Sequence, residues 1–563
     1  MALQTRQINS SDVTPINRPF SYPGTGGNFT RAVSSMRLDE DILFGSSVSP
    51  GATQSSIKNA NELTAKFRPL EGEFAANGTH LGGAGPTTIN SEPQNYRDTF
   101  VNSPNIVFDA DCLRIQSVLE AGTYNLIVRA GLLSTSAGGL NVNLPGGTTT
   151  TAIADIGLTS TDLSNIEVGT VANGGNNGYM VVSAKDSANS TITFEEVTCG
   201  AKTAYKANYA LHFWKIAFCR IATGTTVATG DATIPLARAL PSWVVPGMIV
   251  RGIRRTSGAT QGQDPRSGRD MRVGTIASDR MSFTIPGGFN QSSNFTLEGA
   301  NFAGVMILPG LSSSQIWSRK NYGPQLFDTL TDGSTRKRSV QAILVEMSQP
   351  VQTWAAPPFG GIYKKTDIDT YLTNNPTAAF GYFPAIWLYG WRPGPNGDGQ
   401  STTNSVPWNE IDIYECFGRT GLGGRAWTGN CHSMPYSRKG NVDSISATPN
   451  RHRALKATWE TSSADVKMLT ADRAVLTLDT ALTDGNRHTY GIVWTDSKVL
   501  HYLDGVVVCE SDWSVEHDFP HQLGINLAMG MMTFSQSANF IMPMSDAMAV
   551  QNIKVHRIQS WSY

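Results

Sequence analysis

One eight-residue run, WNEIDIYE at 408–415, limits what this part of the chain can form, because it alternates carboxylates with isoleucines. Side chains of a β-strand point alternately to its two faces, so Glu410 and Asp412 share one face. Ile411 and Ile413 share the other face and need burial. The run therefore predicts a strand of a packed sheet, with one buried face and one face that carries acids.

The third acid of the run, Glu415, lies five positions after Glu410 and would point to the opposite face of a regular strand. A β-bulge between Asp412 and Glu415 would return it to the acid face. Carboxyls that share a cleft raise one another's pKa, so one can stay protonated while another is ionised. A retaining glycosidase uses such a pair at roughly 5 to 5.5 Å, whereas the roughly 6.5 to 9.5 Å of an inverting pair fits this spacing less well. The alternative interpretation is a solvated strand face.

The composition favours an all-β protein with many turns. The 563 residues include 55 glycines and 28 prolines, which favour turns. Alternating runs such as 105–115 are typical of half-buried hairpins. Lys and Arg number 44 against 45 Asp and Glu, with 16% charged residues, which argues against nucleic acid or an anionic membrane as partner. No run approaches the roughly 18 to 20 apolar residues of a membrane helix, and residues 1–10 lack the order of a signal peptide. We expect no membrane insertion and no export by the general route.

Changes of composition along the chain predict distinct regions. Residues 1–100 are rich in Ser, Asn, Gly, Thr and Pro and are expected to form an extended N-terminal arm for attachment. Residues 119–310 carry short β-like runs between glycine-rich turns and are expected to form a β-rich insertion. Within it, the segments 244–252, 273–278 and 283–287 resemble segments of phage tail-fibre and other virion proteins. We therefore expect the arm to bind other virion proteins, and the chain to form a homo-oligomer.

The sequence predicts no metal site and no cofactor. Its six cysteines form no CxxC pair and no cluster with histidines at metal-ligand spacing. The sequence also contains no HExxH motif, no glycine-rich phosphate loop after a strand and no G-x-S-x-G elbow. Nucleotide-dependent enzymes and serine hydrolases are therefore excluded as function classes.

Several segments, taken together and in order, resemble glycoside hydrolase family 16. The stretch 410–415 matches the E-x-D-x-x-E hallmark of the bulged, laminarinase-, agarase- and carrageenase-like subgroup, and 383–388 is similar to its Pro-Ala-x-Trp-Leu strand. The other similar segments are 429–432, 487–495, 500–505, 523–530 and 548–555. The resemblance covers 101–118 and 311–563, and it implies a β-jelly-roll sandwich that the insertion interrupts.

The resemblance also implies roles for the three acids. Glu410 would be the nucleophile, Glu415 the general acid/base, and Asp412 the residue between them that orients the nucleophile and tunes proton affinity. The implied substrates are β-linked glucans or galactans. Many members of the subgroup carry a calcium-binding Asp where Gln551 stands here, and a neutral amide is a poorer ligand for this hard cation. We therefore expect no calcium.

A further set of residues could bind substrate: Trp387, Trp391, Trp408, Trp427, His432 and Asn526. Indole rings can stack on the C–H faces of sugars, and Trp408 lies two positions before Glu410, so it shares the acid face. His432 and Asn526 could form hydrogen bonds in the cleft. Core packing is the alternative for each tryptophan, and a satisfied core position is the alternative for His432.

Together these observations predict an endo-acting, retaining glycosidase that hydrolyses β-linked glycans of a capsule or exopolysaccharide. The missing signal peptide and the virion-like segments suggest a phage tail or particle protein that acts outside the cell. A non-catalytic glycan-binding adhesin and a structural virion protein with a vestigial cleft are the alternatives. The intact acid motif argues against a pure binder, which gains little from three crowded carboxylates.

Overall fold

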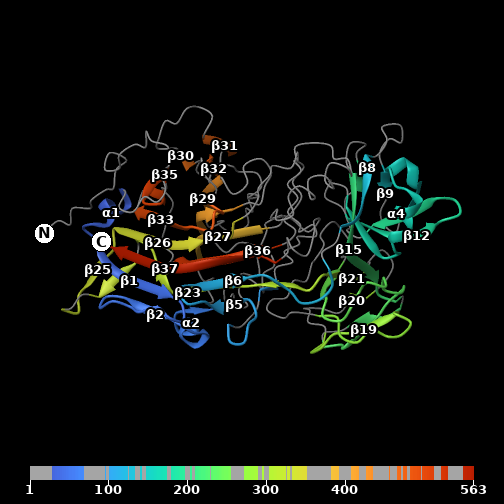
Figure 1. Cartoon of the computed structure of the whole chain (residues 1–563), viewed down its shortest axis with the longest axis horizontal. Helices are drawn as coiled ribbons and strands as arrows, with labels where there is room; N and C mark the ends of the chain where they lie inside the picture. The colour runs from blue at the N-terminus through green and yellow to red at the C-terminus, as the bar shows by residue number, and fades with distance from the viewer. Residues whose placement is uncertain are drawn as a thin grey trace, which may run out of the picture.

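The structure of the protein is a computed structural model. The described residues are 28–68, 95–96, 100–123, 126–132, 140–142, 148–173, 179–196, 203–205, 210–222, 224–227, 230–254, 272–288, 295–296, 303–324, 326–329, 332–351, 382–391, 408–416, 426–434, 455–456, 466–470, 473–477, 482–495, 498–512, 521–529 and 550–563. Strands dominate them, which confirms the all-β class (Figure 1). Among these residues, no helix has the length and apolar character needed to cross a membrane.

Two large sheets form a sandwich. Sheet A contains β1 (Arg37–Phe44), β2 (Ser55–Ile57), β5 (Ile106–Phe108), β6 (Leu113–Gln116), β26 (Val340–Ser348), β30 (Leu455–Lys456), β33 (Arg487–Thr495), β34 (Lys498–Leu503), β35 (Val506–Asp512) and β37 (Asn552–Ser562). Sheet B runs in the order β3 (Phe67–Arg68), β23 (Gln315–Tyr322), β36 (His521–Met529), β27 (Tyr382–Trp391), β28 (Trp408–Glu415), β29 (Ala426–Met434), β32 (Arg473–Thr477) and β31 (Val466–Thr470).

The core lies between these sheets because each presents one apolar face to the other. Ile343 and Ile492 of sheet A belong to the same buried cluster as Ile386, Ile411 and Ile525 of sheet B. The period-2 alternation of a strand then gives the intervening residues of sheet B to the face turned away from sheet A. We call this the outer face of sheet B.

The first part of the chain contributes strands to both sheets. β1 pairs with β37, and β3 pairs with β23 at the edge of sheet B. Between them, α2 (Ala60–Lys66) is capped at its N-terminus by Asn59, whose side chain accepts a hydrogen bond from the Glu62 N–H. The expected arm over residues 1–100 is therefore wrong for these segments, which are part of the sandwich. Their apolar residues reach the core, since Ile42 and Phe44 are fully buried.

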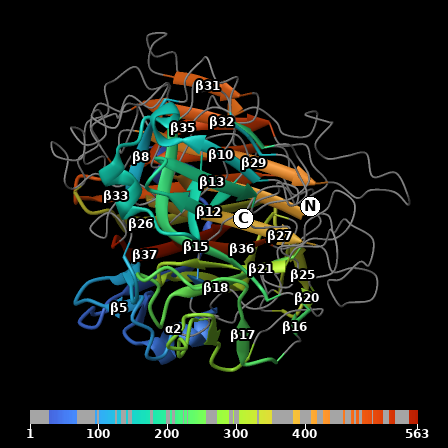
Figure 2. The ribbon, with the colours of Figure 1, turned by 90° about the vertical axis from the view of Figure 1, so that its right-hand side faces the viewer.

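A third sheet is built from residues that lie between the early and late strands of the sandwich. Its strands are β8 (Leu126–Leu132), β10 (Thr148–Ala152), β11 (Thr170–Asn173), β12 (Tyr179–Asp186), β13 (Thr191–Glu196), β15 (Ala210–Arg220), β18 (Ile249–Arg254) and β21 (Ala303–Leu308). In the described part of the chain, these strands pair with no strand of sheet A or B. Figure 1 shows this sheet at the opposite end of the long axis from β1 and β37, and Figure 2 views the molecule from that end.

Short elements complete the structure. The helical ones are α1 (Asn28–Val33), the 3-10 helix η3 (Ile153–Ile156) and α4 (Ser160–Asn165). The paired short strands are β9 (Leu140–Val142) with β14 (Thr203–Tyr205), β16 (Thr226–Val227) with β20 (Phe295–Thr296), β17 (Thr233–Pro235) with β19 (Ser282–Thr284), and β24 (Phe327–Thr329) with β25 (Thr335–Lys337). A last group joins β22 (Leu311–Ser313) to β4 (Asn95–Tyr96) and β7 (Val118–Leu119).

The two ends of the region that carries the third sheet lie together. Leu119 of β7 pairs with Leu311 of β22, and the backbones of Glu120 and Ala121 exchange hydrogen bonds with Gly310. The chain thus leaves the sandwich and returns to it at one place.

Candidate active site

The strand β28 contains the bulge that its acids require. On the β29 side, Asp412 pairs with Asn430 and Glu415 pairs with Thr428, so three residue steps on β28 span two on its neighbour. The pairing with β27 shifts at the same place. An extra residue in one strand is the definition of a β-bulge. The bulge predicted between Asp412 and Glu415 is therefore confirmed.

The bulge gives all three acid positions the same parity, which means that they fall on the same face of the strand. Glu410, Asp412 and Glu415 pair with Tyr389, Trp387 and Ala385 of β27, which alternate regularly along one face. The intervening Ile411 and Ile413 are fully buried in the core. The acid positions therefore belong to the outer face of sheet B. The side chain of Glu410 lies outside the described residues.

Two of the acids have buried side chains. Asp412 is 2% exposed and Glu415 is 9% exposed. Carboxylates are rarely buried to this extent unless they are paired or hydrogen-bonded, because burial removes their hydration. Two buried acids on either side of one bulge are more than a solvated strand face would hold, so the geometry favours a chemical role for them.

Trp387 and Asn526, both predicted from the sequence, meet beside these acids. The Trp387 Nε1–H donates a hydrogen bond of 2.8 Å to the Asn526 side-chain oxygen. Trp387 pairs with Asp412, while Ala385 pairs with both Asn526 and Glu415. The hydrogen bond therefore fixes the indole next to the strand that carries the acids. This arrangement suits a ring that is to contact a sugar.

The strand register also places the other predicted residues, whose side chains lie outside the described residues. Position 432 pairs with Glu410, and positions 391 and 408 pair with each other on the acid-bearing parity. Trp427 is different. It pairs with Leu476 and directly precedes Thr428, which has the acid parity. Alternation gives Trp427 the core-facing parity, so the register does not support a sugar-stacking role for it.

Sequence reasoning missed several residues of the outer face. A continuous row of paired positions crosses sheet B from Arg68 through Trp317, Gly524 and Trp387 to Asp412. The ring centroids of Trp317 and Trp387 lie 4.7 Å apart in an edge-to-face arrangement. These residues come from distant parts of the chain, and only the strand pairing shows that they share a row.

Gly524 makes room for this row. A Cβ atom built on Gly524 would lie 2.8 Å from the Trp317 ring, closer than packed carbon atoms allow. Trp317 is itself buried at 2% exposure. The glycine therefore lets the two indoles meet across β36.

A buried polar network anchors the strand beyond the bulge. The Gln349 amide N–H₂ donates to the Tyr414 hydroxyl at 2.8 Å and to the Tyr490 hydroxyl at 3.2 Å. The Tyr382 hydroxyl donates to the Gln349 carbonyl oxygen at 3.0 Å. Burial raises the pKa of Tyr382 and Tyr414, which keeps both hydroxyls protonated. A fully satisfied network of this kind rigidifies the sheet around it.

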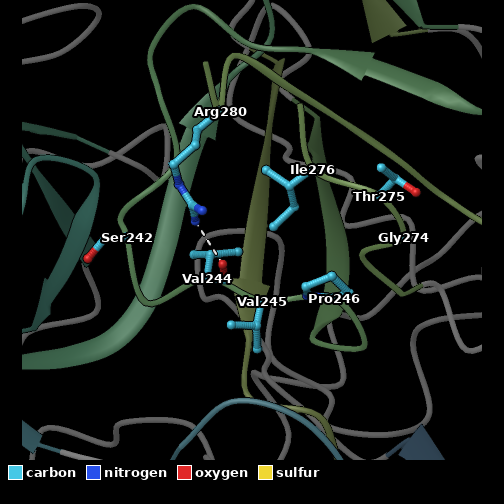
Figure 3. A pocket seen from close by; sticks show the side chains of 8 residues that line it. All are labelled: Ser242, Val244, Val245, Pro246, Gly274, Thr275, Ile276 and Arg280. Atoms are coloured by element: carbon cyan, nitrogen blue, oxygen red, sulfur yellow. Dashed lines mark hydrogen bonds between the residues drawn. The ribbon is translucent and has the colours of Figure 1, made fainter. Parts of the chain in front are cut away.

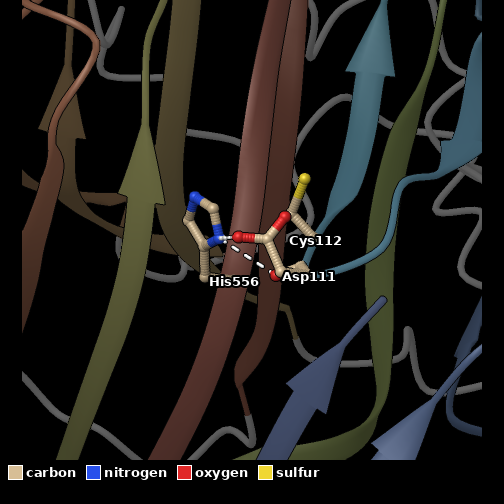
Figure 4. Close-up of side chains that lie close together, drawn as sticks. All are labelled: Asp111, Cys112 and His556. Carbon is tan, nitrogen blue, oxygen red and sulfur yellow. Dashed lines mark hydrogen bonds and ion pairs between the residues drawn. The ribbon is translucent and has the colours of Figure 1, made fainter. Parts of the chain in front are cut away.

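One mixed cluster, Asp111, Cys112 and His556, has the residue types of a metal site (Figure 4). Its contacts favour a structural role. His556 Nδ1 donates to the Asp111 backbone oxygen at 3.1 Å, and Nε2 lies 2.9 Å from the Ser348 hydroxyl. Arg487 forms an ion pair with the Asp111 carboxylate, and burial raises the pKa of the Cys112 thiol to about 12. A cation would have to displace or oppose each of these groups.

A separate hollow of about 430 Å³ lies in the inserted region (Figure 3). Its described lining includes Val244, Pro246 and Ile276 and contains no Asp or Glu. Arg280 at its edge donates hydrogen bonds to the backbone oxygens of Leu240 and Val244. The arginine thus ties the surrounding loop together, and the residues described around the hollow offer no carboxylate or imidazole for acid–base chemistry.

Comparisons with known proteins give structural neighbours only. No family model matches the sequence, and no curated protein matches it. Three solved structures that resemble the chain are a glycoside hydrolase family 16 endo-glucanase from Bacteroides ovatus (15% identity, 44% of this chain and 75% of that chain, TM-score 0.25), an endo-β-1,3-glucanase from Pyrococcus furiosus (15%, 57% and 76%, 0.23) and the laminarinase catalytic domain from Thermotoga maritima (13%, 57% and 79%, 0.23). The assignment of the site rests on its own geometry.

Proposed function

We propose that the protein is a retaining endo-glycosidase that cleaves β-linked glycans on the outer face of sheet B. The observation that carries this proposal is the bulge, because it gives Glu410, Asp412 and Glu415 one parity. The burial of Asp412 and Glu415 supports it, as does the indole of Trp387 beside them.

The reaction needs two steps. Glu410 attacks the anomeric carbon while Glu415 gives its proton to the departing glycosidic oxygen, which leaves a glycosyl ester on Glu410. Glu415 then takes a proton from water, and the water oxygen attacks the anomeric carbon and releases Glu410. Asp412, between the two, orients the nucleophile. The configuration at the anomeric carbon is retained because it is inverted twice.

Reducing-end release from a panel of β-glucans, galactans and bacterial exopolysaccharides tests the proposal. Wild type should release reducing ends, and Glu410→Gln and Glu415→Gln should lower the rate by roughly 10⁴-fold on natural glycans. Glu415→Gln should keep more activity on an aryl glycoside with a good leaving group, which does not need the proton. NMR of the first product should show the β-anomer.

Two results would lead elsewhere. Glycan binding without release of reducing ends would favour an adhesin that uses the same face. Full activity in Glu410→Gln would exclude this residue as the nucleophile. The location on a phage particle and the capsule or exopolysaccharide substrate stay predictions from the sequence, and immunogold labelling of purified particles would test the location.

A further inference from the structure

A histidine of sheet A contacts the bulge from behind. His501 lies on β34, and its Nε2 is 3.1 Å from the backbone oxygen of Asp412 on β28. The imidazole is fully buried. A carbonyl oxygen can only accept, so Nε2 carries the proton of this hydrogen bond. Burial lowers the pKa of His501 to about 4, which keeps the ring neutral with a single N–H near neutral pH.

This contact falls at the residue where the strand register changes. In a regular strand, the backbone oxygen of a residue bonds to a neighbouring strand in the same sheet. At Asp412 the register shifts toward both neighbours of β28, and a bulge disrupts the ladder locally. Here a side chain of the opposite sheet donates to this oxygen. The His501 side chain therefore forms a hydrogen bond directly with the backbone of the bulge.

We propose that His501 is a positioning residue that holds the bulge of β28 in place, and through it holds Glu415 on the outer face. This inference rests on the proposed function for its catalytic consequence. A shift of one residue reverses the face to which every following side chain points. Loss of the bulge would therefore turn position 415 toward the core, while Glu410 and Asp412 would keep their faces. His501 thus controls whether the general acid meets the substrate.

The proposal separates a donor effect from a packing effect. His501→Gln keeps an N–H donor at a position close to that of Nε2, whereas His501→Met fills similar space without a donor. Leu500→Ala is a matched control, because Leu500 is fully buried on the same strand but belongs to a different cluster, with Phe29 and Val493. All three changes should lower the melting temperature.

Steady-state kinetics should distinguish these variants. We expect His501→Met to lower kcat roughly 100-fold with KM within about threefold of wild type, since a misplaced acid slows chemistry without removing sugar contacts. His501→Gln should recover at least tenfold of this loss, and Leu500→Ala should keep kcat within about threefold of wild type. Equal kcat losses in His501→Met and His501→Gln, or a normal kcat in His501→Met, would overturn the proposal.

A crystal structure of His501→Met gives a second readout that needs no activity. The proposal expects Glu415 to lose its pairing with Thr428 and to change faces. An unchanged register, with Asp412 opposite Asn430 and Glu415 opposite Thr428, would overturn it. If wild type cleaves no glycan, the proposed function fails, but the structure of the variant still decides the role of His501.

Discussion

The guanidinium of Arg68 donates a hydrogen bond of 2.8 Å to the side-chain oxygen of Gln522. The bond joins the edge strand β3 to β36, across 454 positions of sequence. Arg68 is paired with Trp317, so it stands at the start of the row that leads to Asp412. A glycan that lies across the strands of sheet B would reach this arginine at its far end.

Replacement of Arg68 should therefore weaken substrate binding more than it slows chemistry. Arg68 is four strands from Asp412, roughly 19 Å at the usual strand spacing. We expect Arg68→Ala to raise KM about tenfold, the size of a hydrogen bond to a charged group, with kcat little changed. Michaelis–Menten kinetics on long glycan chains measures this. Lys66→Ala is the control, because Lys66 faces Glu40 at 3.8 Å instead of the row; an equal rise of KM in both variants would contradict the prediction.

An alanine at Gly524 should disturb the indole pair. The added methyl group would lie 2.8 Å from the Trp317 ring, so Trp317 or the backbone must move. Overpacking of this kind costs about 1 to 3 kcal/mol of folding free energy. Gly491→Ala is a matched control in sheet A, where the new atom would lie 2.8 Å from a Leu344 methyl group. Urea unfolding should show a loss of folding free energy in both variants, but only Gly524→Ala should raise KM. A normal KM in Gly524→Ala would show that the indole pair does not contribute to substrate binding.

His488 should make folding stability depend on pH. Burial acts to lower its pKa, but the hydrogen bonds and charges of Asp504 and Asp484 outweigh burial and raise the pKa above its usual value. The protonated form is thus favoured in the folded state, so this contribution is complete below about pH 6.5 and is lost as the pH rises through the raised pKa. The difference in melting temperature between wild type and His488→Gln should decrease as the pH is raised from 5.5 to 9. A constant difference would exclude the effect.

The ion pair of Asp41 and Arg557 should hold β1 to β37. Arg557 donates to both carboxylate oxygens of Asp41, whose side chain is 4% exposed. Removal of one partner leaves a buried charge and costs roughly 3 kcal/mol. Arg557→Met should therefore lower the free energy of unfolding by about this amount, and Asp41→Asn in the same chain should restore part of it. Guanidinium unfolding of the single and double variants measures both; additive losses would contradict the coupling.

The acid strand could be predicted because its information is local. Alternation fixes the parity of Glu410 and Asp412, and the odd offset of Glu415 requires a bulge if the three acids are to work together. The apolar side chains of Ile411 and Ile413 identify the buried face. None of these inferences needs a partner strand.

The positions that composition alone could not place depend on pairing over long distances. β1 lies in a region rich in Ser, Asn, Gly, Thr and Pro and pairs with β37 at the other end of the chain, so the composition around it resembles that of an arm. The parity of Trp427 follows only from the register of β29 against β28. Arg68 and His501 reach β28 through neighbouring strands or the opposite sheet, and no spacing in the sequence encodes such contacts.

The closure of the inserted region at Glu120, Ala121 and Gly310 has a consequence for how such a chain can be rebuilt. Since the backbones of these residues are already hydrogen-bonded, the residues between them form a cassette with adjoining ends. A short turn could replace the cassette at little cost in chain entropy, and an unrelated domain with neighbouring termini could be spliced in its place. The sandwich can thus carry different inserted domains at this position while its two sheets stay unchanged.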